Sequence, residues 1–123
     1  MTDRQDSPGS CGLVAVHQIR CLLWYDRPVV ALYAGPDHPI LAWLIDELRP
    51  DTGAPQDMLA GYGLPDPLDA AFKADAIDIH GLRDAGAPAY HLRLDGPTFL
   101  AWRVPALAES DMPAPGMTWS DLA

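Results

Sequence analysis

Basic residues are scarce in this sequence. Its 123 residues include one lysine and seven arginines against seventeen acidic residues, which gives a formal net charge of −9. The basic residues stand singly along the chain and form no local patch. Because a negative field repels phosphate backbones and anionic lipid head groups, we expect no direct binding to nucleic acid or to a membrane.

Cysteines and long apolar runs are scarce as well. Cys11 and Cys21 are too few to build the disulfide framework of a small secreted protein. No apolar run approaches the roughly 20 residues that a membrane-spanning helix needs. The first twelve residues are polar and include two aspartates, unlike the basic start and apolar core of a secretory signal. We therefore expect a cytoplasmic protein.

Catalytic motifs are also missing. All four serines fall in predicted tails, where a nucleophile and its base are hard to hold in place. The Gly61-Tyr62-Gly63 run lacks the third glycine and the preceding strand of a phosphate-binding loop. His38 and His91 are candidate general bases, but no spacing pattern supports either. We expect no catalytic residue and no cofactor, and we lean away from an enzyme without excluding one.

Two groups of residues contain metal-ligating side chains. The first group is Cys11, His17 and Cys21, and the second is Asp75, Asp78 and His80. The first lacks the close cysteine pairs of structural zinc sites, and a strand would hold its histidine about 13 Å from its second cysteine. A helix would place the two carboxylates of the second group side by side but would turn the histidine away. We expect no metal at either group.

The composition predicts one folded domain. Apolar residues make up 49% of the chain, and 123 residues can bury a single core. We expect residues 1–10 to form a flexible tail and residues 11–109 to form a single α+β domain. Residues 110–123 contain Pro113 and Pro115 and are expected to form an extended C-terminal arm.

Alternation of apolar and polar residues predicts two hairpins. Residues 13–25 alternate with a period of two, and residues 29–33 are a β-branched run that suits the return strand. Residues 90–94 and 99–104 alternate in the same way on either side of Asp95-Gly96, a dipeptide typical of tight turns. The expected sheet is therefore antiparallel and made of these two hairpins.

The middle of the chain is predicted to be helical. Residues 40–49 fit a helix or a third strand, and residues 50–66 read as a loop with three prolines and three glycines. Asp66 before Pro67 suits the cap of a helix that runs towards Gly81 and can break near Asp78. The resulting fold class is α+β, a small antiparallel sheet of two hairpins with a helical middle segment.

Several short motifs resemble a family of small uncharacterised bacterial proteins. They are Tyr25-Asp26-Arg27-Pro28, residues 41–47, residues 77–85 and Met112-Pro113-Ala114-Pro115-Gly116. Members of that family carry a Tyr-Asp-Gly-Pro turn, where this chain has Arg27 in place of glycine, and end near Leu-Pro-Glu-Pro-Gly. The resemblance spans most of residues 20–117. It implies strands before and after a helical middle, favours a strand at residues 40–49, and implies no activity.

Acidic residues concentrate in the middle of the chain. Nine of the seventeen lie between Asp46 and Asp84, against three basic residues. Such a segment indicates a basic partner, or else a solvated helix face that only keeps the protein soluble. The candidate partner-binding residues on it are Asp57, Asp69, Asp75 and Asp78.

The C-terminal arm supplies candidate apolar anchors, namely Met117 and Trp119, since tryptophan and methionine are typical of interface cores. The alternative is that Trp119 packs on the protein's own sheet. We therefore expect a non-catalytic protein-binding module that engages a basic partner surface, in an inhibitor, antitoxin-like or immunity-type role. The alternative is a small enzyme or metal-binding protein whose site is assembled from dispersed histidines and aspartates. An exposed sheet edge would also allow a homodimer.

Overall fold

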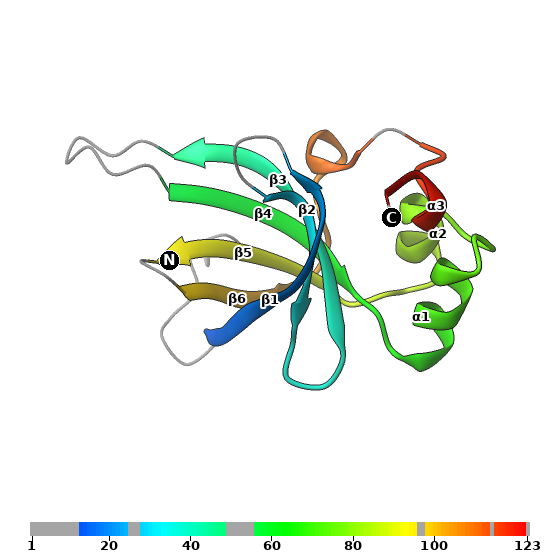
Figure 1. Cartoon of the computed structure of the whole chain (residues 1–123), viewed down its shortest axis with the longest axis horizontal. Helices are drawn as coiled ribbons and strands as arrows, with labels where there is room; N and C mark the ends of the chain where they lie inside the picture. Colours follow the sequence, from blue (N-terminus) through cyan, green and yellow to red (C-terminus); the bar gives the residue numbers. More distant parts are fainter. Residues whose placement is uncertain (1–12, 25–27, 49–55, 96–97, 114, 123) are drawn as a thin grey trace.

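The protein is built on a closed barrel of antiparallel strands (Figure 1). A computed structural model describes residues 13–24, 28–48, 56–95, 98–113 and 115–122. The strands are β1 Val14–Trp24, β2 Pro28–Ala34, β3 Pro39–Leu48, β4 Gln56–Gly63, β5 Ala89–Asp95 and β6 Thr98–Val104. The helices are α1 Asp66–Lys73, α2 Ile79–Asp84, the 3-10 turn η2 Glu109–Asp111 and α3 Trp119–Leu122. Neighbouring strands follow the chain order, and β1 closes onto β6.

The α+β fold predicted from the sequence is wrong, although several of its elements are confirmed. Both predicted hairpins are present, as β1 with β2 and β5 with β6. The strand interpretation of residues 40–49 is confirmed by β3 as far as Leu48, and residue 49 lies outside the described residues. The error lies in residues 50–66, because Gln56–Gly63 form β4, which pairs with β3 on one side and β5 on the other. This strand joins the two hairpins into one closed sheet, and the helices become a layer outside it.

The sequence of β4 does not alternate between apolar and polar residues, because both faces of the strand are buried. Leu59 and Ala60, which point to opposite faces, are 1% and 0% exposed. Gly61 lies opposite Ala42 of β3, and a Cβ at Gly61 would meet the Leu41 carbonyl oxygen and the Ala42 backbone. The glycine that reads as a loop signal is therefore required by the close approach of two strands.

The first strand closes the barrel by changing partners along its length. Residues 14–16 of β1 pair with β6, and residues 17–24 pair with β2. Register shifts interrupt the pairing with β2 between Gln18 and Arg20 and again between Cys21 and Leu23. Such irregularities bend a strand and increase its twist, which allows β1 to serve both edges of the sheet.

The barrel interior is filled by residues from all six strands and from no helix of the described chain. The buried set is Val16, Ala31, Tyr33, Ile40, Ala42, Leu59, Tyr90, Leu92 and Ala101. Tyr33 of β2 and Phe99 of β6 belong to strands that are not neighbours, yet their ring centroids lie 4.9 Å apart. Side chains that are buried by strands alone face the barrel axis, so this set is the inner core.

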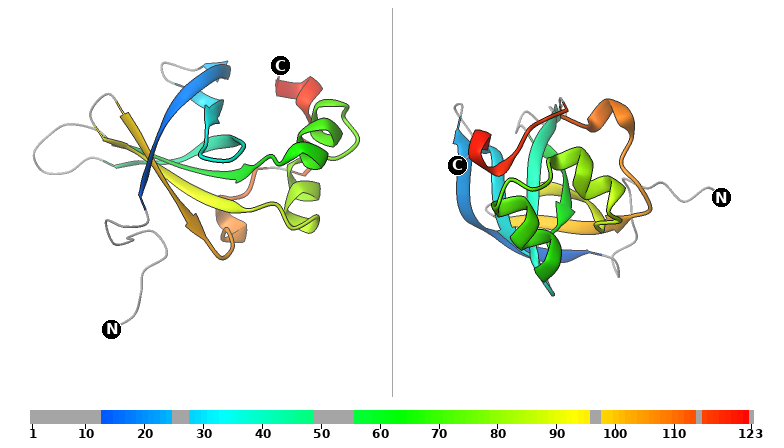
Figure 2. Two further views of the ribbon diagram at one scale, coloured as in Figure 1. Left: turned by 90° about the horizontal axis from the view of Figure 1, so that it is seen from below. Right: turned by 90° about the vertical axis from the view of Figure 1, so that its right-hand side faces the viewer.

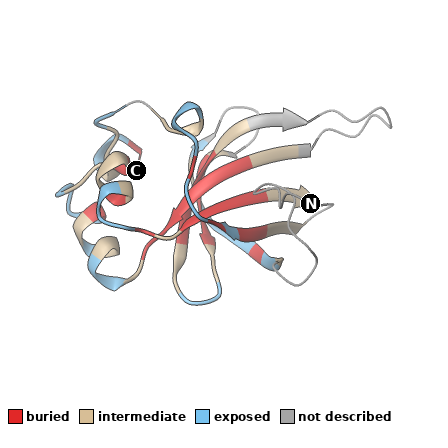
Figure 3. Ribbon diagram, turned by 180° about the vertical axis from the view of Figure 1, so that it is seen from behind, coloured by how far each residue is buried: buried red, intermediate tan, exposed pale blue. Residues whose placement is uncertain are grey.

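The opposite face of strands β2–β6 is apolar too and carries a second layer. Trp43, Tyr62 and Trp102 lie in a buried cluster with Phe72 of α1 and Leu82 of α2. Residues 64–88 and residues 105–122 supply this layer, which we call the cover; position 114 lies outside the described residues. Figure 2 shows the helices gathered on one side of the strands, and Figure 3 shows buried residues along the strands and exposed ones on the cover.

The predicted helix is divided into two short ones. Lys73 ends α1, and Asp75 adopts a positive φ of 61°, which a continuing helix does not allow. The side-chain cap lies before α2, where the Asp78 carboxylate accepts a hydrogen bond from the Gly81 N–H at 2.7 Å. The expected capping role of Asp66 is wrong, because Pro65 precedes α1 and no side chain caps that helix.

The C-terminal arm folds onto the protein instead of extending away. Its described residues include part of η2 and all of α3. Leu122 is buried in the outer cluster, and Met117 and Trp119 pack against it. Trp119 packs on the chain's own domain, where its ring lies against Phe72 of α1, and its role as a partner anchor stays a prediction. Residues 1–10, predicted to be a tail, lie outside the described residues.

Replacing Gly61 with alanine tests the close contact between β3 and β4. The added Cβ must displace the backbone of β3, so we expect the free energy of unfolding to fall by about 2 to 3 kcal/mol. Urea unfolding followed by circular dichroism measures this change. Gly86→Asn is the control, because a Cβ there meets nothing within 4 Å and asparagine tolerates its positive φ. Equal losses in the two variants would contradict the strand contact.

Candidate functional site

Acidic charge gathers on the cover of the barrel. The cover holds eight acidic residues against two basic ones, and thus carries minus six of the net charge of minus nine. The acidic residues are Asp66, Asp69, Asp75, Asp78, Asp84, Glu109, Asp111 and Asp121. The fold therefore places five of the nine acidic residues of the predicted segment on the cover, together with three from residues 105–122.

Asp75 lies at the break between α1 and α2 and holds the C-terminal helix. Its carboxylate accepts a hydrogen bond from the Ser120 N–H at 2.9 Å and a second one from the Ser120 hydroxyl. These bonds, the hydroxyl's first and the N–H's second, lower the pKa of Asp75 below its ordinary value. Asp75 is exposed as predicted, but its carboxylate is already engaged within the chain.

Asp78 links residues 105–122, which we call the C-terminal segment, to α2 in the same way. One carboxylate oxygen accepts from the Gly81 N–H, and the other accepts from the Gly116 N–H at 2.8 Å. The bonds from Gly116 and Gly81 lower the pKa of Asp78. Gly116 adopts a positive φ of 88°, a turn conformation that glycine enters readily. Asp75 and Asp78 therefore act together as two anchors for residues 116–120.

The other two predicted aspartates lie in different places. Asp69 forms an ion pair with Lys73, one helical turn away, with an N···O distance of 3.2 Å. Asp57 is at the start of β4, and that end of the strand lies far from the helices (Figure 1). There its charge adds to the effects of burial and of Cys21 in raising the pKa of Tyr33. The structure thus brings Asp69, Asp75 and Asp78 to one side of the barrel and leaves Asp57 apart.

The two predicted apolar anchors sit at the edge of the cover. The Trp119 ring contacts Phe72 of α1 at a centroid distance of 6.2 Å. Arg20 and Lys73 each place their charged group 5.6 Å from its ring centroid, within reach of a cation–π interaction. The Met117 carbonyl oxygen accepts a hydrogen bond from the Ile79 N–H at 3.1 Å. Both anchor side chains are half-buried, so part of each remains open to solvent.

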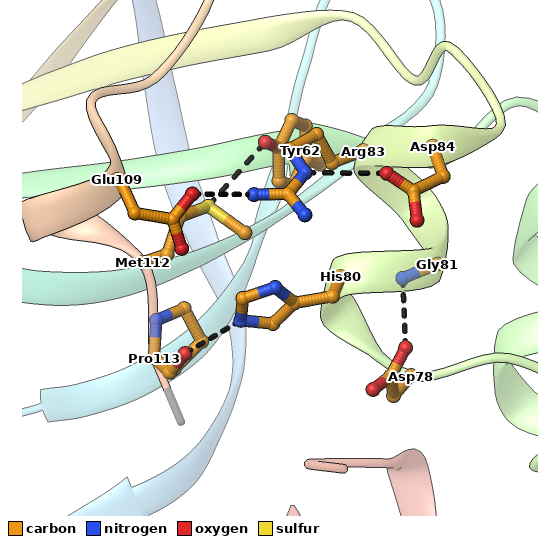
Figure 4. A network of polar contacts seen from close by, with 9 residues as sticks. All are labelled: Tyr62, Asp78, His80, Gly81, Arg83, Asp84, Glu109, Met112 and Pro113. Carbon is orange, nitrogen blue, oxygen red and sulfur yellow. Dashed lines mark hydrogen bonds and ion pairs between the residues drawn. The ribbon is translucent and has the colours of Figure 1, made fainter. Parts of the chain in front are cut away.

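A further set of contacts fastens residues 109–113 to α2 and β4 (Figure 4). His80 lies 2.8 Å from the Pro113 carbonyl oxygen, and the Tyr62 hydroxyl donates to the Met112 sulfur at 3.4 Å. The Arg83 guanidinium pairs with Glu109 at 2.9 Å and with Asp84 at 3.3 Å. His80, counted above with Asp75 and Asp78 as a metal candidate, is thus directed to a backbone oxygen.

An apolar pocket of about 290 Å³ opens between strands β1–β3 and the C-terminal segment. Leu23 and Val29 stand on its strand side, and Met112 and Met117 stand on its other side. Trp43 also lines it, and the Trp43 indole N–H donates to the Asp111 carbonyl oxygen at 2.7 Å. Sequence reasoning missed this pocket because its walls lie far apart along the chain and each wall reads alone as ordinary core.

A second pocket, of about 260 Å³, lies between the end of α2 and the end of β6. Arg83 and Arg103 both line it. The charge of Arg83 is balanced by Asp84 and Glu109, whereas Arg103 lies over the Tyr90 ring at 5.6 Å. Since two carboxylates accompany two guanidinium groups, the pocket offers no excess positive charge to attract an anion.

The histidines and cysteines that could serve chemistry are dispersed. His38 lies 3.5 Å from the Tyr90 hydroxyl, and His91 is buried with its ring edge-on to Trp102. Neither lines the two pockets above. Within the described part of the chain, no three histidine, cysteine or acidic side chains group closely enough to hold a metal ion. Cys11, a member of the first metal candidate, lies outside that part.

The helices of the described residues are too short and too polar to cross a lipid bilayer.

Neutralising either anchor carboxylate should loosen the C-terminal segment. An amide oxygen accepts a weaker hydrogen bond than a carboxylate, so we expect Asp75→Asn to speed hydrogen exchange at the Ser120 N–H. Asp78→Asn should do the same at the Gly116 N–H, each on the order of tenfold at neutral pH. Asp84→Asn, which removes the same charge from the end of α2, is the matched control. NMR hydrogen exchange measures these rates.

The pH dependence of this effect follows from the lowered pKa values. Both folded pKa values lie below the ordinary 3.8, so the stabilisation is present at neutral pH and is lost as the pH falls through the lowered values. Wild type and each variant should therefore converge in acid. A difference that persists there would show that the carboxylate charge is not what holds the segment.

Three comparisons with known proteins add no assignment: no protein-family model, no curated protein sequence and no solved structure matches this chain. The resemblance in short motifs therefore stays a prediction.

Proposed function

We propose that this protein is a non-catalytic protein-binding module that engages a basic protein surface through its cover. The observation that carries the proposal is the segregation of charge, since the cover holds minus six of the net minus nine. Both basic side chains of the cover are already paired with its own carboxylates, Lys73 with Asp69 and Arg83 with Asp84 and Glu109. The eight carboxylates outnumber these two basic groups, and Asp84 and Glu109 share a single guanidinium, so the cover keeps an excess of negative charge.

Such a field favours one class of partner. It attracts a basic protein over a distance of about 10 Å at moderate ionic strength and raises the rate of productive encounter. The same field repels nucleic acid and anionic membranes. A cytoplasmic inhibitor, antitoxin-like or immunity-type protein is the role that we propose, because such proteins work by occupying a partner's charged surface.

The carboxylates of the cover divide into two kinds. Asp75 and Asp78 contribute charge but also hold the C-terminal segment, so replacing them would change both properties at once. Asp66 and Asp84 are exposed and contribute charge, and neither accepts a hydrogen bond from residues 116–120, which Asp75 and Asp78 hold. Asp66 and Asp84 are therefore the better positions for testing binding. Asp57 would take part only with a partner that also reaches the far end of β4.

Charge reversal at Asp66 or Asp84 should weaken partner capture without unfolding the protein. We expect Asp66→Lys and Asp84→Lys each to reduce the affinity on the order of tenfold, because a lysine places like charges opposite the basic partner. The experiment captures partners from the native host with the wild-type chain as bait and then measures the affinity of the recovered partner for each variant. Asp37→Lys, an equal charge change in the exposed β2–β3 connection, is the control.

The capture experiment contradicts the proposal in two ways. One is the recovery of no stoichiometric partner, and the other is a partner that all three variants bind as tightly as the wild type. Circular dichroism and thermal unfolding of the variants separate lost binding from lost structure.

A further inference from the structure

The apolar pocket lies at the seam between the barrel and the C-terminal segment. We propose that this pocket receives an apolar side chain of the basic partner. The inference rests on the proposed function and adds to it the point at which the partner is anchored. A central apolar contact inside a charged surface is the usual arrangement of a protein interface, where the charges steer and the buried side chain holds.

The lining of the pocket selects an apolar occupant. Nine of its eleven lining residues are apolar. The Trp43 indole N–H is already bonded to the Asp111 carbonyl oxygen, and the Met112 sulfur already accepts from Tyr62. A polar group that entered would lose hydrogen bonds to water and find few replacements. An aliphatic or aromatic side chain would instead gain the full benefit of leaving water.

The size of the pocket selects a side chain rather than a cofactor. Its volume of about 290 Å³ lies at the lower limit of small-molecule sites, which span about 300 to 1,000 Å³. Met112 and Met117 form one wall, and methionine adapts its shape readily to what it packs against. Leu23 stands at the pocket and is 47% exposed, so the chain leaves an apolar contact uncovered there.

The charge around the pocket selects the partner. Asp111 lines the pocket itself, and the cover, which forms one side of the pocket, carries minus six. Lysine or arginine residues that flank an apolar anchor would meet this charge as the anchor enters. A second copy of the chain would bring another acidic cover against the first, and like charges facing each other oppose association. The occupant is therefore a basic segment of another protein.

Two synthetic peptides test the pocket on the full chain. One has a central leucine flanked by lysines, and the other has serine in place of that leucine. We expect the leucine peptide to bind on the order of tenfold more tightly, because only its central side chain is buried. NMR titration should show the Trp43 indole N–H and the methyl signals of Met112 and Met117 moving with the leucine peptide and not with the serine peptide.

Two substitutions in β1 distinguish peptide binding in the pocket from apolar contact elsewhere on the same strand. Leu23→Ser removes a pocket residue and should weaken the leucine peptide several-fold while leaving the serine peptide unchanged. Ile19→Ser removes a side chain that is 55% exposed on the same strand but does not line the pocket, and it should change neither peptide.

The outcomes distinguish the pocket from the proposed function. Equal binding of the two peptides overturns the inference that the pocket receives the partner's side chain. The proposed function survives that result if Asp66→Lys still weakens the binding of both peptides. Absence of binding by either peptide at low salt overturns the pocket and counts against the proposed function as well. If the pocket signals move with protein concentration alone and sedimentation shows a dimer, a second copy fills the pocket and the inference is wrong.

Discussion

The architecture depends on one constraint: strands β2–β6 of the barrel are apolar on both faces, and both faces must be removed from water. One face, which includes Tyr33 and Leu59, points into the barrel and is buried there by the other strands. The second face exposes Trp43, Tyr62 and Trp102 unless another layer lies over it. Residues 64–88 and 105–122 form that layer. The barrel therefore requires the helices and the C-terminal segment to bury its second apolar face.

This constraint explains why the acidic residues serve two purposes. The segment that covers the apolar face is held by Asp75 and Asp78, whose carboxylates accept hydrogen bonds from the backbone N–H groups of Ser120 and Gly116. The layer as a whole then presents a surplus of carboxylates outward. Where the layer meets β1–β3 it fits incompletely and leaves the apolar pocket. The proposed binding surface and the pocket are therefore both consequences of how the barrel is covered.

The elements that the sequence predicted correctly are those whose signal is local. Alternation identifies β1, β5 and β6, because a period of two is visible within each segment, and a β-branched run identifies β2. Alternation fails for β4, because both faces of that strand are buried. Its Gly61 is typical of a loop in the sequence, although the close contact with β3 is what requires a glycine there. Likewise, Asp75 and Asp78 could be predicted as charged surface residues but not as anchors. Their partners Ser120 and Gly116 lie 45 and 38 positions away, a relation that spacing does not reveal.

The central claim is that the cover is the surface that meets the partner. It is tested most directly by amide hydrogen exchange on this protein with and without the recovered partner. We expect slower exchange in α1, α2 and the C-terminal segment when the partner is bound, and no change at the far end of the β3–β4 and β5–β6 hairpins. Protection confined to that far end of the barrel, with unchanged exchange in the cover, would contradict it.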